Sequence, residues 1–175
     1  MLFRSLPAYR NKAIDASITN EPTMTRAIEE GAAARIIGND ETYPDQQTAV
    51  VFYSGNFASR RDVAERFMRA YVRGIRVYND ALKDGHFAGP KADQVIPVLI
   101  KYTPIKDAAL YRRIVPSAVN PDGHVNMTGL RLDLAFFREL GLIESRDITV
   151  ERVVDRSFVQ AALEKLGPYR AAAGQ

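Results

Sequence analysis

Hydrophobic residues in the first 54 positions form three short runs that predict β-strands. Residues 13–19 place Ile14, Ala16 and Ile18 on one side of an extended chain, which is the period of a strand. Residues 33–37 predict a second strand, and residues 48–54 form a nearly continuous β-prone run, as in a strand buried on both faces. Between the first two runs we expect a helix capped by Asn20 and ended by Gly31. The polar residues 39–47 are expected to form a loop.

From residue 59 onward, apolar residues recur at steps of three and four, which is typical of amphipathic helices. The longest predicted helix covers 59–83, where Ser59 and Asp62 resemble a capping box and Gly85 follows as the stop. Further helices are predicted over 92–101, 106–114, 129–140 and 157–166. Gly141 and Gly167 mark the ends of the last two helices. Pro97 should shorten or kink the first of these four helices.

The order strand, helix, strand, strand and helical tail predicts an α/β fold with an incomplete sheet, because sheets usually carry about four to six strands. We expect the missing strands to lie upstream of this sequence. Residues 1–5 are expected to be a non-native start, since Met-Leu-Phe-Arg-Ser can be encoded by a stretch resembling a sequencing-adapter end; a natural short N-terminus is the alternative. Residues 6–54 then form a partial α/β lobe that begins with the tail of a helix at 6–12, residues 55–169 form a helical part and 170–175 a disordered tail.

Composition narrows the possible functions. The chain of 175 residues has 24 basic and 21 acidic residues, and the net charge of +3 is only weak evidence for a polyanionic partner. Because there is no cysteine, disulfides, thiol nucleophiles and Cys-ligated zinc are excluded. No apolar run approaches the roughly 20 residues of a membrane helix. Composition leaves the cellular compartment open.

The sequence shows no signal for catalysis or for a cofactor. His86 and His124 each follow an Asp-Gly pair, and we expect both to be surface-loop residues rather than metal ligands or acid–base groups. The motifs of serine hydrolases, P-loop proteins, dinucleotide-binding proteins and HExxH metalloproteases are absent. We therefore predict no catalytic residue, no metal and no cofactor, and a protein that is not an enzyme.

An arginine stripe follows one side of the predicted long helix: Arg66, Arg69, Arg73 and Arg76. Asp62 and Glu65 precede the first two of these arginines by four residues, which is the favourable order for ion pairs on a helix surface. No aromatic residue interleaves with the stripe, so we expect a solvated helix face and no nucleic-acid partner. A protein partner for the stripe stays open.

The most informative chemistry lies where the first predicted strand meets the first predicted helix, at Thr19, Asn20, Glu21, Pro22 and Thr23. In open α/β sheets, ligands bind just beyond the carboxyl ends of strands. Free N–H groups at a helix start favour an anionic ligand, whereas the Glu21 carboxylate favours an amine or a ring N–H. The alternative is that Asn20 and Glu21 only cap the helix. Ligand charge stays open.

Several segments, taken in order, resemble ABC-transporter substrate-binding proteins of the nitrate/sulfonate/taurine and thiamine-pyrimidine family. The first is residues 13–22, with Gly31 closing the following helix. The second is 50–58, with Ser54, Phe57 and Ala58, followed by the helix start at 63–71. The third comprises the Asp-Gly turn in 120–126, the helix end at 140–143 and the C-terminal stretch 153–167. The resemblance covers about residues 13–167.

The resemblance implies part of a periplasmic binding protein type 2-like fold: the closing part of lobe two, the return to lobe one, and a helical C-terminal tail. It implies a periplasmic or cell-surface receptor that captures a small solute by cleft closure and delivers it to an ABC permease and ATPase complex, with membrane contact only through the permease. It supports Thr19–Pro22 as ligand-facing, with Glu21 as the best candidate.

Ligand identity stays open between nitrate, an alkanesulfonate, a pyrimidine and an aromatic acid. A thiamine-pyrimidine precursor synthase-like enzyme and a ligand-sensing effector domain of a transcription regulator are the alternatives.

Overall fold

The computed structural model describes residues 5–47, 49–117 and 119–171, of which 52% lie in helices. None of these helices is long and apolar enough to cross a membrane. The helices of the described residues are α1 (Ser5–Arg10), α2 (Thr23–Glu29), α3 (Asn39–Thr42), α4 (Gly55–Ser59), α5 (Arg61–Asp80), α6 (Ala92–Tyr102), α7 (Ala108–Arg113), α8 (Met127–Glu139), α9 (Val150–Val153) and α10 (Ser157–Leu166).

The predicted α/β fold, and with it the partial periplasmic binding protein type 2-like architecture, is wrong. The described residues form no sheet, and their only β-type pairing is an isolated bridge between Lys83 and His86. Residues 13–19, 33–37 and 49–54 are not strands; Thr48 lies outside the described residues. The physical reason is that a strand needs a neighbouring backbone to take its N–H and C=O groups, and an alternating pattern alone does not supply one. At the second predicted strand, the amides of Ala32 and Ala33 instead donate to the Ala27 carbonyl, at 2.9 and 3.2 Å, and close α2.

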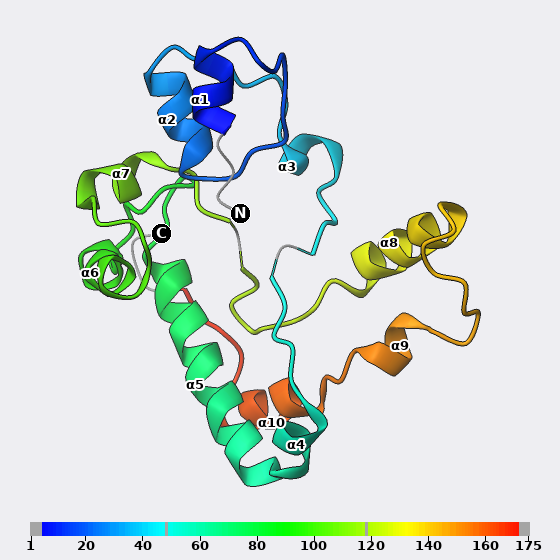
Figure 1. The fold of residues 1–175 in the computed structure, drawn as a ribbon. Coiled ribbons are helices and arrows are strands. Elements are labelled where there is room, and N and C mark those ends of the chain that lie inside the picture. The colour runs from blue at the N-terminus through cyan, green and yellow to red at the C-terminus, as the bar shows by residue number, and fades with distance from the viewer. Residues whose placement is uncertain (1–4, 48, 118, 172–175) are drawn as a thin grey trace. The chain divides into compact units, whose positions relative to one another are not determined.

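The chain divides into two compact units. Unit 1 contains residues 5–42 and 81–116, with α1 against α2 and α6 against α7 (Figure 1). Phe87 and Leu110 are almost fully buried in this unit. The ring of Phe87 meets the ring of Tyr111 edge-on, with centroids 6.0 Å apart. A small aromatic and aliphatic core therefore holds α7 in place.

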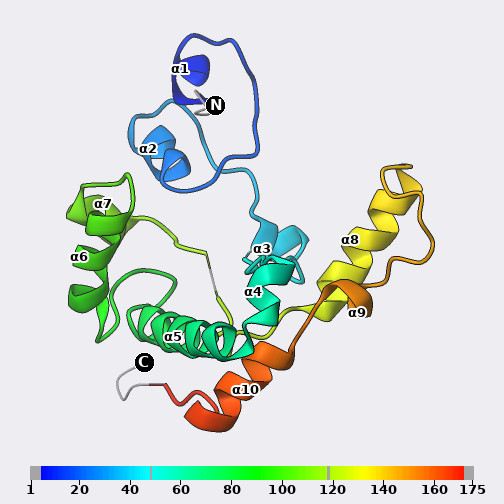
Figure 2. The same ribbon diagram turned by 60° about the horizontal axis from the view of Figure 1, so that its bottom comes forward.

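Unit 2 contains residues 43–80 and 117–171, and its main feature is the packing of α10 along α5 (Figures 1 and 2). Val72 of α5 and Val159 and Ala162 of α10 form the buried centre of this contact. α4 also packs against α5. Residues of both α5 and α10 line a cavity in this unit.

The helix predictions after residue 59 are confirmed, with differences at the ends. α5 begins at Arg61, because Ser59 belongs to α4 and its hydroxyl donates to the Asn56 carbonyl at 3.0 Å. Pro97 lies inside α6, which continues to Tyr102. Gly141 and Gly167 have φ angles of 71° and 67° after α8 and α10, as helix-ending glycines do.

Three short helices were not predicted: α3, which lies in the expected loop 39–47, α4 and α9. Residues 1–4 of the expected non-native start and 172–175 of the expected tail lie outside the described residues.

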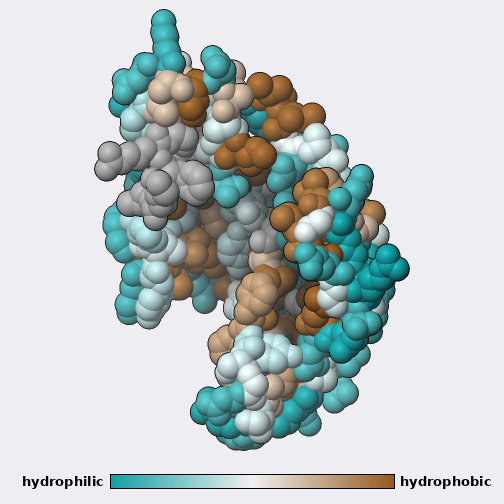
Figure 3. Space-filling view, turned by 45° about the vertical axis from the view of Figure 1, so that its right-hand side comes forward, coloured by the Kyte–Doolittle hydropathy of each residue, from teal (hydrophilic) through white to brown (hydrophobic). Residues whose placement is uncertain are grey.

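Figure 3 shows hydrophobic residues (brown) at the surface of the drawn face, among hydrophilic ones.

Candidate functional site

A cavity of about 430 Å³ lies within unit 2. Its walls come from the extended segment before α4, the middle of α5, the turn before α8 and the start of α10. The volume falls within the range of about 300–1,000 Å³ that is usual for small-molecule sites. This cavity is the candidate functional site of the protein.

Aromatic side chains form part of the cavity wall. Tyr53 and Phe158 meet edge to face, with ring centroids 5.5 Å apart and an interplanar angle of 84°. Tyr71 reaches the cavity from α5, where its ring stacks on that of Phe67 with centroids 6.5 Å apart. Such rings present flat apolar surfaces together with polar hydroxyl tips.

A hydrogen-bonded pair, Tyr53 and Asp155, lies at the cavity. The Tyr53 hydroxyl donates to Asp155 Oδ2 at 2.9 Å, and the Ser157 amide donates to Asp155 Oδ1 at 2.8 Å. Hydrogen bonding from Ser157 lowers the pKa of Asp155. Burial raises the pKa of Tyr53, and the hydrogen bond to Asp155 raises it further by a smaller amount. At neutral pH the pair therefore consists of a carboxylate and a neutral phenol.

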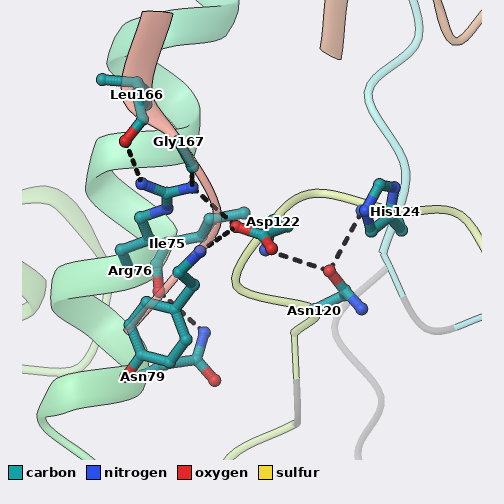
Figure 4. Close-up of polar contacts among 9 residues, drawn as sticks. Ile75, Arg76, Asn79, Asn120, Asp122, His124, Leu166 and Gly167 are labelled. Atoms are coloured by element: carbon teal, nitrogen blue, oxygen red, sulfur yellow. Dashed lines mark hydrogen bonds and ion pairs between the residues drawn. The ribbon is translucent and has the colours of Figure 1, made fainter. Parts of the chain in front are cut away.

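The turn before α8 forms another wall. Asn120 Oδ1 accepts hydrogen bonds from the amides of Asp122 and His124, at 3.0 and 3.2 Å (Figure 4). Gly123 has a φ angle of 71°, and a Cβ at this position would lie 3.1 Å from a methyl group of Val159. Glycine is therefore needed here both for the backbone angle and for the close approach of the turn to α10.

Arg76 fixes this turn to the helix pair (Figure 4). Its guanidinium donates to Asp122 Oδ1 at 2.6 Å, to the Leu166 carbonyl at 3.5 Å and to the Gly167 carbonyl. The side chain is only 16% exposed. The prediction of a solvated arginine face is thus wrong for Arg76. Its side chain is largely buried because it binds the Asp122 carboxylate and the backbone carbonyls at the C-terminal end of α10.

The other ion pairs on α5 agree with the prediction in part. Arg66 pairs with Asp62 at 3.4 Å across one helical turn, as expected. Glu65 instead pairs with Arg61, at 2.7 Å, rather than with Arg69. The absence of a nucleic-acid partner stays a prediction.

The predicted ligand-binding residues Thr19–Thr23 belong to unit 1, whereas the cavity belongs to unit 2. The Thr19 hydroxyl bonds to that of Ser17 at 2.6 Å. The Asn20 carbonyl accepts hydrogen bonds from the amides of Thr23 and Met24, at 3.1 and 3.3 Å. These residues therefore shape the start of α2, and Asn20 does so through its backbone.

Glu21 and Pro22 are joined by a cis peptide bond, and Pro22 occupies the N-cap position of α2. The half-buried Glu21 carboxylate accepts hydrogen bonds from the Thr25 amide at 3.2 Å and the Thr25 hydroxyl at 2.9 Å. It also accepts a hydrogen bond from the Val115 amide at 3.4 Å. These contacts are those of a residue that stabilises the first turn of a helix; a ligand-binding role for Thr19–Thr23 stays a prediction.

The two histidines occupy different surroundings. Nδ1 of the half-buried His86 lies 3.0 Å from the Ile114 carbonyl in unit 1, whereas the exposed His124 lines the cavity of unit 2. In the described part of the chain, no group of three or more His, Cys, Asp or Glu side chains could hold a metal ion.

Sequence reasoning singled out the segments 120–126 and 153–159 for their resemblance to solute receptors, but not as parts of a site. Their convergence depends on α10 packing along α5, which no local pattern encodes. In the sequence, the only indications of a site in these segments are polar side chains next to predicted helix starts, namely Asn120, Asp155 and Arg156.

Fold and site together define a helical protein with a ligand-sized cavity in unit 2. No family model, curated protein or solved structure matches the chain.

Proposed function

We propose that this protein binds a small solute in the cavity of unit 2 and does not transform it. The observation that carries the proposal is the cavity itself: about 430 Å³, with aromatic walls and a few polar groups. Apolar pockets with a few well-placed polar groups are typical of small-molecule sites. The carboxylate of Asp155 already accepts two hydrogen bonds and its pKa is lowered, which suits a fixed charge better than a general base.

Delivery of that solute to an ABC permease and ATPase complex, in the periplasm or at the cell surface, is the biological setting that we propose. It is supported by the sequence resemblance alone, over the segments between about residues 13 and 167. The proposal makes no use of the α/β fold or of closure between two lobes.

The experiment is a screen of the full chain by isothermal titration calorimetry, using nitrate, taurine, a hydroxymethylpyrimidine and benzoate as the first compounds. Val50 lines the cavity and is partly exposed, so Val50→Trp should fill the cavity without disturbing a buried core. Val98 is a comparably exposed valine on α6 in unit 1, and Val98→Trp is the matched control. We expect at least one compound to bind the wild type and Val98→Trp but not Val50→Trp. If no compound binds, or if binding survives Val50→Trp, the proposed function is wrong.

A further inference from the structure

The cavity of unit 2 carries a cation that the described part of the chain leaves unpaired. Arg156 immediately precedes α10, lines the cavity and is exposed. Its guanidinium has no hydrogen-bond or ion-pair partner among the described residues. What singles out this guanidinium is its position, because it lies in the wall of a ligand-sized cavity.

Among the described residues, no ion pair joins Arg156 to the neighbouring carboxylate of Asp155. Asp155 uses one oxygen for the Tyr53 hydroxyl and the other for the Ser157 amide. A second cation, Arg61, also lies close by: it donates to the Ser157 hydroxyl at 2.8 Å and lies 4.4 Å from the centre of the Phe158 ring. The Asp155 carboxylate is thus stabilised by groups other than Arg156, and the Arg156 guanidinium stays available to a ligand.

The remaining features of the cavity favour a flat ring. The rings of Tyr53, Tyr71 and Phe158 line it, and aromatic rings pack well against one another in edge-on or offset geometry. The hydroxyl of Tyr71 and the imidazole of His124 have no hydrogen-bond partner among the described residues, so each can bind a polar group of the ligand.

We infer that the cavity selects a planar aromatic ligand carrying one anionic group, with Arg156 as the partner of that group. Guanidinium is the side chain best suited to a carboxylate or sulfonate, because its planar fork forms two parallel hydrogen bonds. This inference rests on the proposed function, since it names the class of solute that the cavity binds.

The test is isothermal titration calorimetry of the full chain with three compounds at constant ionic strength: benzoate, benzamide and cyclohexanecarboxylate. Benzamide keeps the ring without the charge, and cyclohexanecarboxylate keeps the charge without the flat ring. We expect benzoate to bind about tenfold to a hundredfold more tightly than benzamide, as is usual for a charge-assisted hydrogen bond. Cyclohexanecarboxylate should also bind more weakly than benzoate.

Arg156→Gln should remove the preference for benzoate over benzamide and leave the affinity for benzamide unchanged. Arg73→Gln is the matched control, because Arg73 is an exposed arginine of the same unit, on α5, and does not line the cavity. Equal losses in the two variants would show a general effect of charge and would overturn the inference. An unchanged benzoate preference in Arg156→Gln would do the same.

Val50→Trp separates this inference from the proposed function. If benzamide binds as tightly as benzoate and Val50→Trp abolishes both interactions, the cavity is a binding site but the anionic class is wrong. If none of the three compounds binds in a manner that depends on Val50, the inference is wrong; the proposed function is wrong as well only if nitrate, taurine and the hydroxymethylpyrimidine also fail to bind.

Discussion

Apolar side chains are buried where α5 packs against α10, whereas several in the extended segments before residue 54 are exposed. In the helix pair, Val72 and Ala162 are fully buried. In the extended segments, Ile18, Ile36 and Phe52 are 95%, 87% and 91% exposed. These apolar residues are of similar kind, so their chemistry does not account for the difference.

The difference lies in how each backbone satisfies its hydrogen bonds. A helix satisfies its N–H and C=O groups internally and is free to pack one face against another helix. An extended segment leaves those groups open until another segment pairs with it, and without that pairing its apolar side chains are not brought together. Burial in this protein therefore follows the helices.

The largest expected effect on stability comes from Arg76→Ala, which removes the hydrogen bonds that join α5 to the end of α10 and to the turn at Asp122. This change removes the Arg76 donor from the carbonyls of Leu166 and Gly167 and from the Asp122 carboxylate, which among the described residues keeps only the Tyr169 amide, at 2.9 Å. Hydrogen bonds to charged groups contribute about 1.5–3 kcal/mol each, so we expect the free energy of unfolding to fall by about 3 kcal/mol. Urea unfolding followed by circular dichroism measures this change.

Arg66→Ala is the control for Arg76→Ala, because it removes an arginine from the same helix. Arg66 forms an exposed pair with Asp62, and such pairs contribute about 0.3–0.5 kcal/mol. Equal effects of the two substitutions would show that the buried contacts of Arg76 do not stabilise the helix pair.

The next largest effect is expected for Val72→Ala in the helix pair, and Ile36→Ala makes the corresponding change in an extended segment. Removing buried methyl groups at Val72 should lower the free energy of unfolding by about 2 kcal/mol, from lost burial and the cavity left behind. The same measurement on Ile36→Ala should change by no more than about 0.5 kcal/mol, as for other exposed positions. A loss at Ile36 as large as that at Val72 would show that the extended segment is buried in solution.

This comparison also explains which parts of the fold could be predicted from the sequence. The spacing of Val63, Phe67 and Tyr71 predicts α5, because helix formation and the apolar stripe are both local properties of the chain. Glycine after the helix, as at Gly167, is equally local. The alternation of Ile14, Ala16 and Ile18 predicts a strand only if a partner is present, and the described residues offer none.

The candidate site could be predicted only in its pieces. The Asp-Gly turn at Asp122 and Gly123 is a local signal, whereas its contact with Val159 is not. Because Arg76 belongs to a charged stripe, the sequence suggested that its side chain is exposed. In the structure, this side chain binds the backbone carbonyls of Leu166 and Gly167 at the end of α10. Residues of the cavity come together through packing between segments far apart in sequence.

The last expected effect is a pH dependence of stability that is confined to pH values above 10. Tyr78 of α5 donates its hydroxyl hydrogen to the Ser117 carbonyl at 3.0 Å, and burial raises the pKa of Tyr78 to about 12 from its ordinary value of 10.0. Below pH 10 the phenol is neutral in both the folded and the unfolded chain, so its contribution to stability is fully present. Between pH 10 and 12 the unfolded chain loses this proton first, and the free energy of unfolding should fall.

Tyr78→Phe should lower stability at every pH through loss of the hydrogen bond to Ser117, yet its stability should decline less steeply between pH 10 and 12. Tyr102→Phe makes the same change at a largely exposed ring on α6 and should keep the slope of the wild type. Urea unfolding at several pH values measures these slopes. Identical slopes for the wild type and Tyr78→Phe would show that the phenol of Tyr78 is hydrated in the folded chain, and would place this end of α5 with the exposed segments rather than with the buried helix pair.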